Sequence, residues 1–132
     1  MAEGREPIVS GRAPAPVGPY PHARRVGNLL FLSGIGSRTP GTNAIAEGIE
    51  AQARQCFANI RIILEDAGAR WEDIVDVTVF LTDMSGDFAT FNRVYAEHFQ
   101  TNQPTRTTVG VVALPTKIAV ELKVVADVGL RS

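Results

Sequence analysis

The chain has 132 residues, enough for one domain with a substantial core and too few for two. Its 13 basic and 14 acidic residues give a formal net charge of −1 and are spread along the sequence, which argues against nucleic acid or an anionic membrane as the partner. No apolar run approaches the roughly 18 residues that span a bilayer, Cys56 is the single cysteine, and no secretory signal pattern is visible, so we expect a cytoplasmic protein.

The N-terminal part of the chain predicts little regular structure. Residues 1–16 mix charge, glycine and proline without periodicity, so we interpret them as a tail ahead of one domain over residues 17–132. Within that domain Tyr20 stands between Pro19 and Pro21, which restrict its backbone. Tyr20 is either an aromatic packed at the start of a strand or a side chain presented in a fixed place.

A hairpin and a loop come next. Gly27 and Asn28 form a two-residue turn signal between two apolar runs, which predicts paired strands within residues 22–34. Glycine, serine, threonine and proline then make residues 34–43 a loop. Its glycines would allow a ligand close to the backbone, and Arg38 is either a second anion contact or simply solvated.

Residues 49–67 predict the first helix. Apolar side chains recur there at three- and four-residue steps, which lays one apolar stripe along the helix. Gly68 is placed to end it with a left-handed cap. Cys56 lies on the stripe, so we interpret it as a small core residue and not as a nucleophile.

A strand and a second helix follow. Residues 74–82 alternate, with Val75 expected on the core side and Ile74 on the opposite side. The second helix is predicted over residues 87–99. Its aromatic face also carries Asn92, whose amide must find hydrogen bonds to the backbone or in a cavity.

No metal site is expected. His22 and His98 are far apart in the sequence, and neither has a second histidine or cysteine at ligand spacing. His98 is better explained as a residue at the C-terminal end of the second helix than as a catalytic base.

The clearest functional signal lies in residues 105–113, an alternating β-branched run bracketed by Pro104 and Pro115. Arg106 stands at the entrance of this predicted strand, where its forked donor could clamp a carboxylate or a phosphate. The alternative is a surface arginine at a strand end.

Residues 117–128 predict the last strand, with Glu121 facing away from the main core. If this strand pairs with the preceding one through a turn at residues 114–116, Glu121 falls opposite Val109, roughly 10 Å along the sheet from Arg106. Such a spacing suits an acid that handles water or protons at one end of a small molecule whose carboxylate is held at the other. The alternative is a solvent-facing strand residue.

Together these elements predict an α+β domain of two layers, with two helices on one face of a mixed sheet. The other face of the sheet would remain half apolar, and small domains commonly bury such a face in a symmetric oligomer. We therefore expect copies of the chain to assemble.

Short motifs follow one another along the chain: VGPY at 17–20, FLSG at 31–34, AQARQ at 51–55, VFLTDM at 79–84, FATFN at 88–92, PTRT at 104–107 and AVEL at 119–122. In order and spacing they resemble the RidA (reactive intermediate deaminase A) family, also called YjgF. The resemblance covers nearly the whole chain, from Val17 to Asp127, and is far more specific than any one motif.

The resemblance implies a chorismate-mutase-like fold and a homotrimer. It also implies clefts between subunits in which enamines or imines of 2-keto acids are hydrolysed to the keto acid and ammonia without a cofactor. By position Arg106 would be the carboxylate-binding arginine and Glu121 the glutamate that orients water. The other cleft residues implied in the same way are Tyr20, Gly34, Asn92 and Thr108.

The chain departs from the commonest family pattern at Pro21-His22, Ile35 and Thr108. Its loop motifs are more similar to the 2-aminomuconate deaminase branch, which hydrolyses an enamine of a six-carbon dicarboxylate. Arg38 would then bind the second carboxylate. A general deaminase of 2-iminobutanoate and 2-iminopropanoate is the alternative, and a ligand-binding or chaperone-like trimer without turnover is another.

Overall fold

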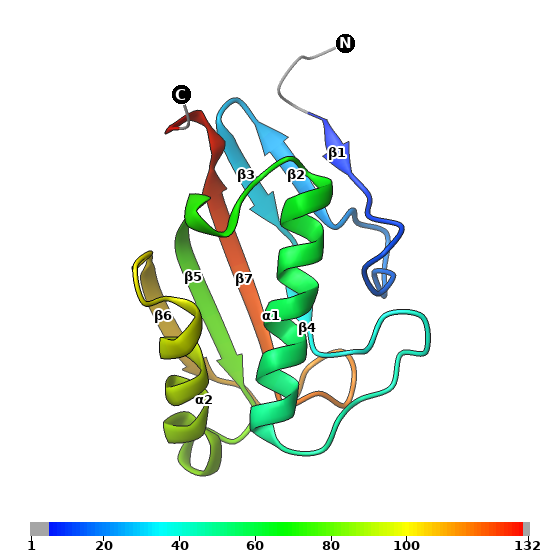
Figure 1. Cartoon of the computed structure of the whole chain (residues 1–132). Helices are drawn as coiled ribbons and strands as arrows, with labels where there is room; N and C mark the ends of the chain where they lie inside the picture. The colour runs from blue at the N-terminus through cyan, green and yellow to red at the C-terminus, as the bar shows by residue number, and fades with distance from the viewer. Residues whose placement is uncertain (1–5, 131–132) are drawn as a thin grey trace.

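The computed structural model describes residues 6–130 and shows two layers, a mixed β-sheet with two helices packed on one face (Figure 1). This arrangement confirms the predicted α+β class. The helices are α1 (Ile49–Asp66) and α2 (Met84–His98). The strands are β1 (Pro7–Ile8), β2 (Ala23–Val26), β3 (Leu29–Leu32), β4 (Ile35–Gly36), β5 (Ile74–Leu81), β6 (Thr105–Gly110) and β7 (Val120–Asp127). Short 3-10 turns, η1 (Trp71–Asp73) and η2 (Val128–Leu130), precede β5 and follow β7.

The strand order decides which functional residues can meet. It runs β1-β2-β3-β7-β5-β6. β4 pairs with the first half of β7, at Glu121 and Leu122, whereas β3 pairs with its last three residues. β5 and β6 are parallel and connected through α2, whereas β5 and β7 are antiparallel. The predicted pairing of residues 105–113 with residues 117–128 is therefore wrong, because β5 lies between them. The helical crossover makes β6 parallel to β5 on its outer side, and residues 111–119 carry the chain back to the other side of β5.

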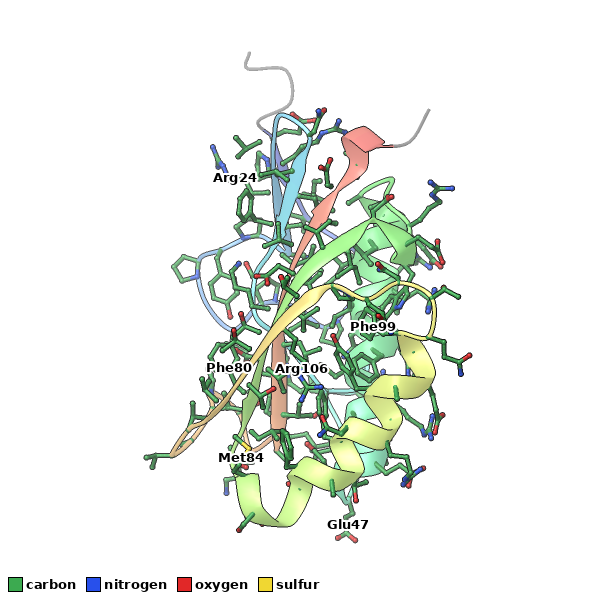
Figure 2. All side chains as sticks on the ribbon, turned by 90° about the vertical axis from the view of Figure 1, so that its left-hand side faces the viewer. Arg24, Glu47, Phe80, Met84, Phe99 and Arg106 are labelled. Carbon is green, nitrogen blue, oxygen red and sulfur yellow. The ribbon has the colours of Figure 1, made fainter. Side chains whose placement is uncertain are left out.

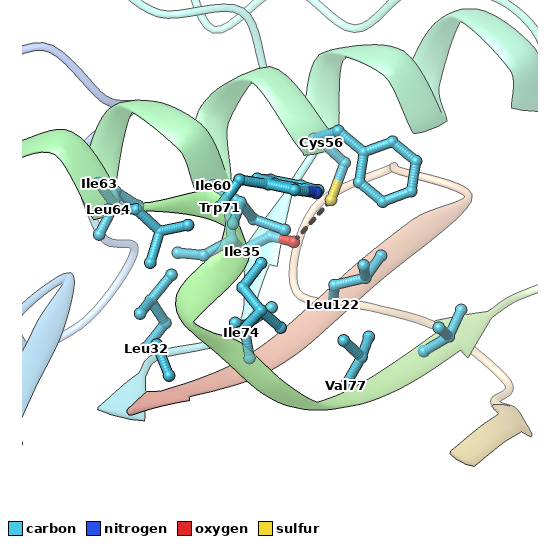
Figure 3. Close-up of a cluster of buried hydrophobic side chains, with 14 of the residues drawn as sticks. Leu32, Ile35, Cys56, Ile60, Ile63, Leu64, Trp71, Ile74, Val77 and Leu122 are labelled. Atoms are coloured by element: carbon cyan, nitrogen blue, oxygen red, sulfur yellow. Dashed lines mark hydrogen bonds between the residues drawn. The ribbon is translucent and has the colours of Figure 1, made fainter. Parts of the chain in front are cut away.

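The hydrophobic core lies between α1 and the sheet (Figure 3). Ile60, Val77 and Leu122 are completely buried there, and full burial of a large aliphatic side chain contributes about 1.5–3 kcal/mol. The Cys56 thiol donates a hydrogen bond to the carbonyl oxygen of Ile35 at 3.1 Å. Burial raises the pKa of the Cys56 thiol, so it stays protonated and its predicted core role is confirmed.

Two residues of β5 face the opposite way from the prediction. Ile74 is buried and Val75 is 38% exposed. The pairing of β5 with β7 shifts between Ile74 and Asp76, and this β-bulge turns Val75 outward. Beyond the bulge the predicted alternation is confirmed, with Val77 and Val79 buried.

The helix ends follow from local capping. α2 begins earlier than predicted because Asp83 caps it, with Asp83 Oδ1 accepting a hydrogen bond from the Gly86 backbone N–H at 3.1 Å. Gly68, at φ 78°, follows α1 in the left-handed conformation, as predicted. Within residues 6–130, neither helix is long and apolar enough to cross a membrane.

The segment ahead of Val17 is packed on the domain, contrary to the predicted tail. β1 pairs with β2, and Ser10 is buried. Arg12 forms an ion pair with Asp66 at the end of α1, with 2.6 Å between Nη2 and Oδ1. The tail prediction is thus wrong for residues 7–16, while residues 1–5 lie outside the described part of the chain.

Candidate functional site

Arg106 lies at the start of β6 and points into the helix layer. Its partner on β5 is Val77, a buried core residue, so both side chains face α2. The Arg106 guanidinium stacks over the ring of Tyr95, with 4.5 Å between Cζ and the ring centroid. Its Nε donates to Thr108 Oγ1 at 2.8 Å and its Nη2 donates to Asn92 Oδ1 at 2.7 Å. The structure therefore brings together Arg106, Thr108 and Asn92, and the Asn92 amide oxygen has the partner it was predicted to need.

The half-buried Arg106 guanidinium has no acidic partner among the described residues. By contrast, the more exposed Arg12, Arg54 and Arg93 all form ion pairs with carboxylates. Burial lowers the pKa of Arg106, but a guanidinium remains charged in a protein. The two hydrogen bonds use two of its five N–H donors, leaving three. A partly desolvated cation with free donors and no counterion is suited to an anionic ligand, above all to a planar carboxylate.

Tyr95 also belongs to this group, although the sequence did not predict it as a site residue. It lies on the aromatic face of the second helix. Its hydroxyl oxygen is buried and has no hydrogen-bond partner among the described residues. Burial raises the pKa of the Tyr95 phenol. The three- and four-residue spacing of Tyr95 from Asn92 and Phe91 was the available signal, since it places all three side chains on neighbouring positions of one helix.

Glu121 lies on β7 and faces the other side of the sheet. Its partners are Phe80 on β5 and Gly36 on β4. No hydrogen bond or ion pair joins its carboxylate to another described residue, and Lys123 donates instead to the carbonyl oxygen of Leu32 at 2.5 Å. Burial raises the pKa of Glu121. A carboxylate that is partly desolvated and unpaired is suited to accept and return a proton.

A hollow surrounds Glu121 and contains further residues that the sequence singled out. Its walls include Tyr20, Gly34, Arg38 and Ile118. Arg38 lines this hollow while its Nη2 donates to the carbonyl oxygen of Ala15 at 2.6 Å and its Nη1 to Asn43 Oδ1 at 3.0 Å. The structure thus groups Glu121 with Tyr20, Gly34 and Arg38, away from Arg106.

Arg106 and Glu121 open onto opposite faces of the sheet in one chain. Arg106 shares its face with Val77, whereas Glu121 shares its face with Phe80. Figure 2 shows the sheet from its edge, with Arg106 on the side of the helices and Phe80 on the other side. The predicted placement of Glu121 opposite Val109, along one ladder with Arg106, is therefore wrong.

Gly34 leaves the room that the Glu121 carboxylate occupies. A Cβ at Gly34 would overlap Glu121 Oε2 and lie 2.9 Å from its Cδ. Because the resemblance to the RidA family implies a reaction that releases ammonia, we expect Gly34→Ala to displace the carboxylate and lower any ammonia release at least about tenfold. The melting temperature should change little, because a flexible side chain can move away. Gly11→Ala is the matched control, since a Cβ there meets nothing within 4 Å. Equal activities of the two variants would contradict this role.

The match to a protein family is nearly complete. The model of the family described as Endoribonuclease L-PSP matches residues 10–128. The chain belongs to this family. The Endoribonuclease L-PSP family includes the RidA and YjgF proteins, so the resemblance found in the motifs is confirmed.

Individual members of the Endoribonuclease L-PSP family agree with this assignment. A RutC family protein of Pyrococcus abyssi is 42% identical over 123 residues, covering 92% of this chain and 96% of the relative. The crystal structure of RidA from Psychrobacter sp. has a TM-score of 0.88 at 41% identity, over 93% of this chain and 99% of that one. The YjgF gene product of E. coli gives 0.86 at 36% identity, over 92% and 98%.

Proposed function

We propose that this protein is a cofactor-independent deaminase that hydrolyses enamines or imines of small carboxylic acids, releasing ammonia. The observation that carries the proposal is the half-buried Arg106, which has free donors and no acidic partner among the described residues. A carboxylate of the substrate supplies the missing counterion. E. coli TdcF, a structural neighbour with a TM-score of 0.87 at 36% identity over 96% of this chain and 99% of that one, was crystallised with bound serine. That ligand is also a small acid bearing nitrogen next to its carboxylate.

The reaction needs few groups because an imine carbon is already electrophilic. Arg106 fixes the carboxylate, and Glu121 orients a water molecule and takes its proton as the oxygen bonds to the C=N carbon. Glu121 passes this proton to the substrate nitrogen, which gives a carbinolamine. Glu121 then takes the proton of the new hydroxyl group and delivers it to the nitrogen, so the C–N bond breaks with both electrons leaving on ammonia and the carbonyl of the keto acid forms.

The two halves of the site require two copies of the chain. Arg106 and Glu121 open onto opposite faces, so we propose a ring of three copies in which Arg106 of one meets Glu121 of the next. The face of the sheet away from the helices supports this assembly because it is half apolar. Its apolar residues include Phe31, Val75, Phe80, Val109 and Val125.

Ammonia release from 2-iminobutanoate generated in situ tests the activity. We expect turnover without added metal or cofactor. Turnover by the parent protein supports the deaminase, whereas its absence on both 2-iminobutanoate and 2-aminomuconate would favour a ligand-binding or chaperone-like trimer. RNA cleavage, which the family description names, has less support because the net charge is −1 and Arg12, Arg54 and Arg93 are neutralised by acids.

A dicarboxylate such as 2-aminomuconate is the finer candidate for the substrate. The observation in its favour is that Arg38 lines the hollow that contains Glu121. We expect Arg38→Ala to lower kcat/KM for 2-aminomuconate about tenfold more than for 2-iminobutanoate, because only the dicarboxylate would have a second acid group to bind. The same loss on both substrates would remove Arg38 from carboxylate binding.

A further inference from the structure

An N-terminal arm, residues 9–19, crosses the end of α1 and reaches the Glu121 hollow. Ser10 is its anchor and is buried. The Ser10 backbone N–H donates to His22 Nδ1 at 2.9 Å, and the Ser10 hydroxyl donates to Asp66 Oδ2 at 2.6 Å. The same hydroxyl oxygen accepts from the backbone N–H groups of Arg12 and Ala13. These bonds hold the first half of the arm against the domain.

His22 ties a second point of the arm with its other ring nitrogen. The ring is only 3% exposed, and His22 Nε2 lies 2.8 Å from the carbonyl oxygen of Pro14. A carbonyl can only accept, so Nε2 carries the hydrogen, while Nδ1 accepts from Ser10. The His22 ring therefore holds the arm at Ser10 and at Pro14, and the Arg38 Nη2 bond to the carbonyl oxygen of Ala15 holds the next residue.

The fixed arm is a wall of the candidate site. Pro14 and Pro16 line a hollow that they share with Tyr20, Gly34 and Arg38. Farther along the arm, Val17 lines the neighbouring hollow that contains Glu121, and Tyr20, Gly34 and Arg38 are common to both. Any shift of the arm would change the space beside the Glu121 carboxylate.

We infer that His22 is a positioning residue that pins the arm and so sets the size of substrate accepted beside Glu121. The selectivity part of this inference rests on the proposed deaminase function. The pinning part does not, because the bonds of His22 to Ser10 and Pro14 are present whatever reaction the protein catalyses.

His22→Ala and His22→Gln test the arm and the site separately. A glutamine can accept from the Ser10 N–H and donate to the Pro14 carbonyl, whereas alanine can do neither. Trypsin cleavage of the Arg12–Ala13 bond, followed by mass spectrometry, reports release of the arm. We expect cleavage to be roughly tenfold faster in His22→Ala and near the parent rate in His22→Gln. His98→Ala is the control for general loosening, because His98 bonds to Val94 on α2 and not to the arm.

The second measurement compares kcat/KM for 2-iminopropanoate with that for a bulkier, branched 2-imino acid. We expect the ratio of the two kcat/KM values, 2-iminopropanoate over the bulkier acid, to fall at least about fivefold in His22→Ala and to be restored in His22→Gln. Unchanged trypsin protection in His22→Ala, or faster cleavage in His98→Ala to the same extent, would overturn the pinning role. Faster cleavage with an unchanged preference would overturn the selectivity role. If the parent releases no ammonia, the proposed function and the selectivity role both fall, while the trypsin result still decides the pinning role.

Discussion

Arg106→Ala is expected to lower kcat/KM for 2-iminobutanoate by about 10²–10⁴-fold, the equivalent of two charge-assisted hydrogen bonds at roughly 1.5–3 kcal/mol each. The guanidinium is half-buried and has no acidic partner among the described residues. The other arginine of the candidate site, Arg38, lines the hollow around Glu121 and not the Arg106 side of the sheet, so it cannot replace Arg106. Ammonia release under saturating and limiting substrate separates the loss into KM and kcat.

Stability should respond differently from activity. Removing Arg106 leaves no buried carboxylate behind, so we expect the melting temperature of Arg106→Ala to stay within a few degrees of the parent. Arg93→Ala is the matched control, because Arg93 lies on α2 but pairs with Glu50 at the exposed surface. Arg93→Ala should retain the activity of the parent. Turnover by Arg106→Ala at the parent rate would refute the carboxylate clamp.

Glu121→Gln is expected to lose activity by about 10²–10⁴-fold, because an amide cannot accept the proton of the attacking water. The sharper experiment combines this variant with Arg106→Ala by co-expression. If each site takes Arg106 from one copy and Glu121 from the next, a random mixture rebuilds roughly a quarter of the sites intact. If both residues act from one chain, every site in the mixture lacks one of them. Mass spectrometry verifies that mixed oligomers have formed. If their activity is no higher than that of the separate variants, a site composed of two copies is refuted.

The ionisation of Glu121 makes the stability of the folded chain depend on pH in a predictable direction. Burial raises the pKa of Glu121 above its ordinary value of 4.5, so the ionised form is disfavoured in the folded chain. Its contribution to stability is therefore most favourable at low pH and is lost as the pH rises from the unfolded pKa through the folded pKa. Glu121→Gln removes this effect, so its melting temperature should exceed that of the parent at neutral pH and converge with it in acid. The acid limb of kcat/KM should likewise lie above pH 4.5, because the ionised carboxylate acts as the base.

Local patterns in the sequence were sufficient for the two helices and the longer strands, but not for β1 and β4. The apolar stripe of residues 49–67 places Cys56 in the core, and alternation places Glu121 outside it, because both depend only on the helix and strand periods. The order of the motifs also identified the family, and two of these motifs contain Arg106 and Glu121. Capping by Asp83 moved the start of α2, and the bulge at Val75 reversed the faces of Ile74 and Val75. Each depends on a contact with one particular neighbour.

The sequence by itself thus determined the two helices, the alternating strands and the candidate residues. Only the tertiary structure decided that β5 separates β6 from β7, and hence that Arg106 and Glu121 open onto opposite faces. It also decided that His22 binds the arm at Ser10 and Pro14. The physical reason is that periodicity fixes which side of an element a residue faces. The choice of strand partner depends on crossovers and on contacts between residues that are distant in the chain, and no local pattern encodes it.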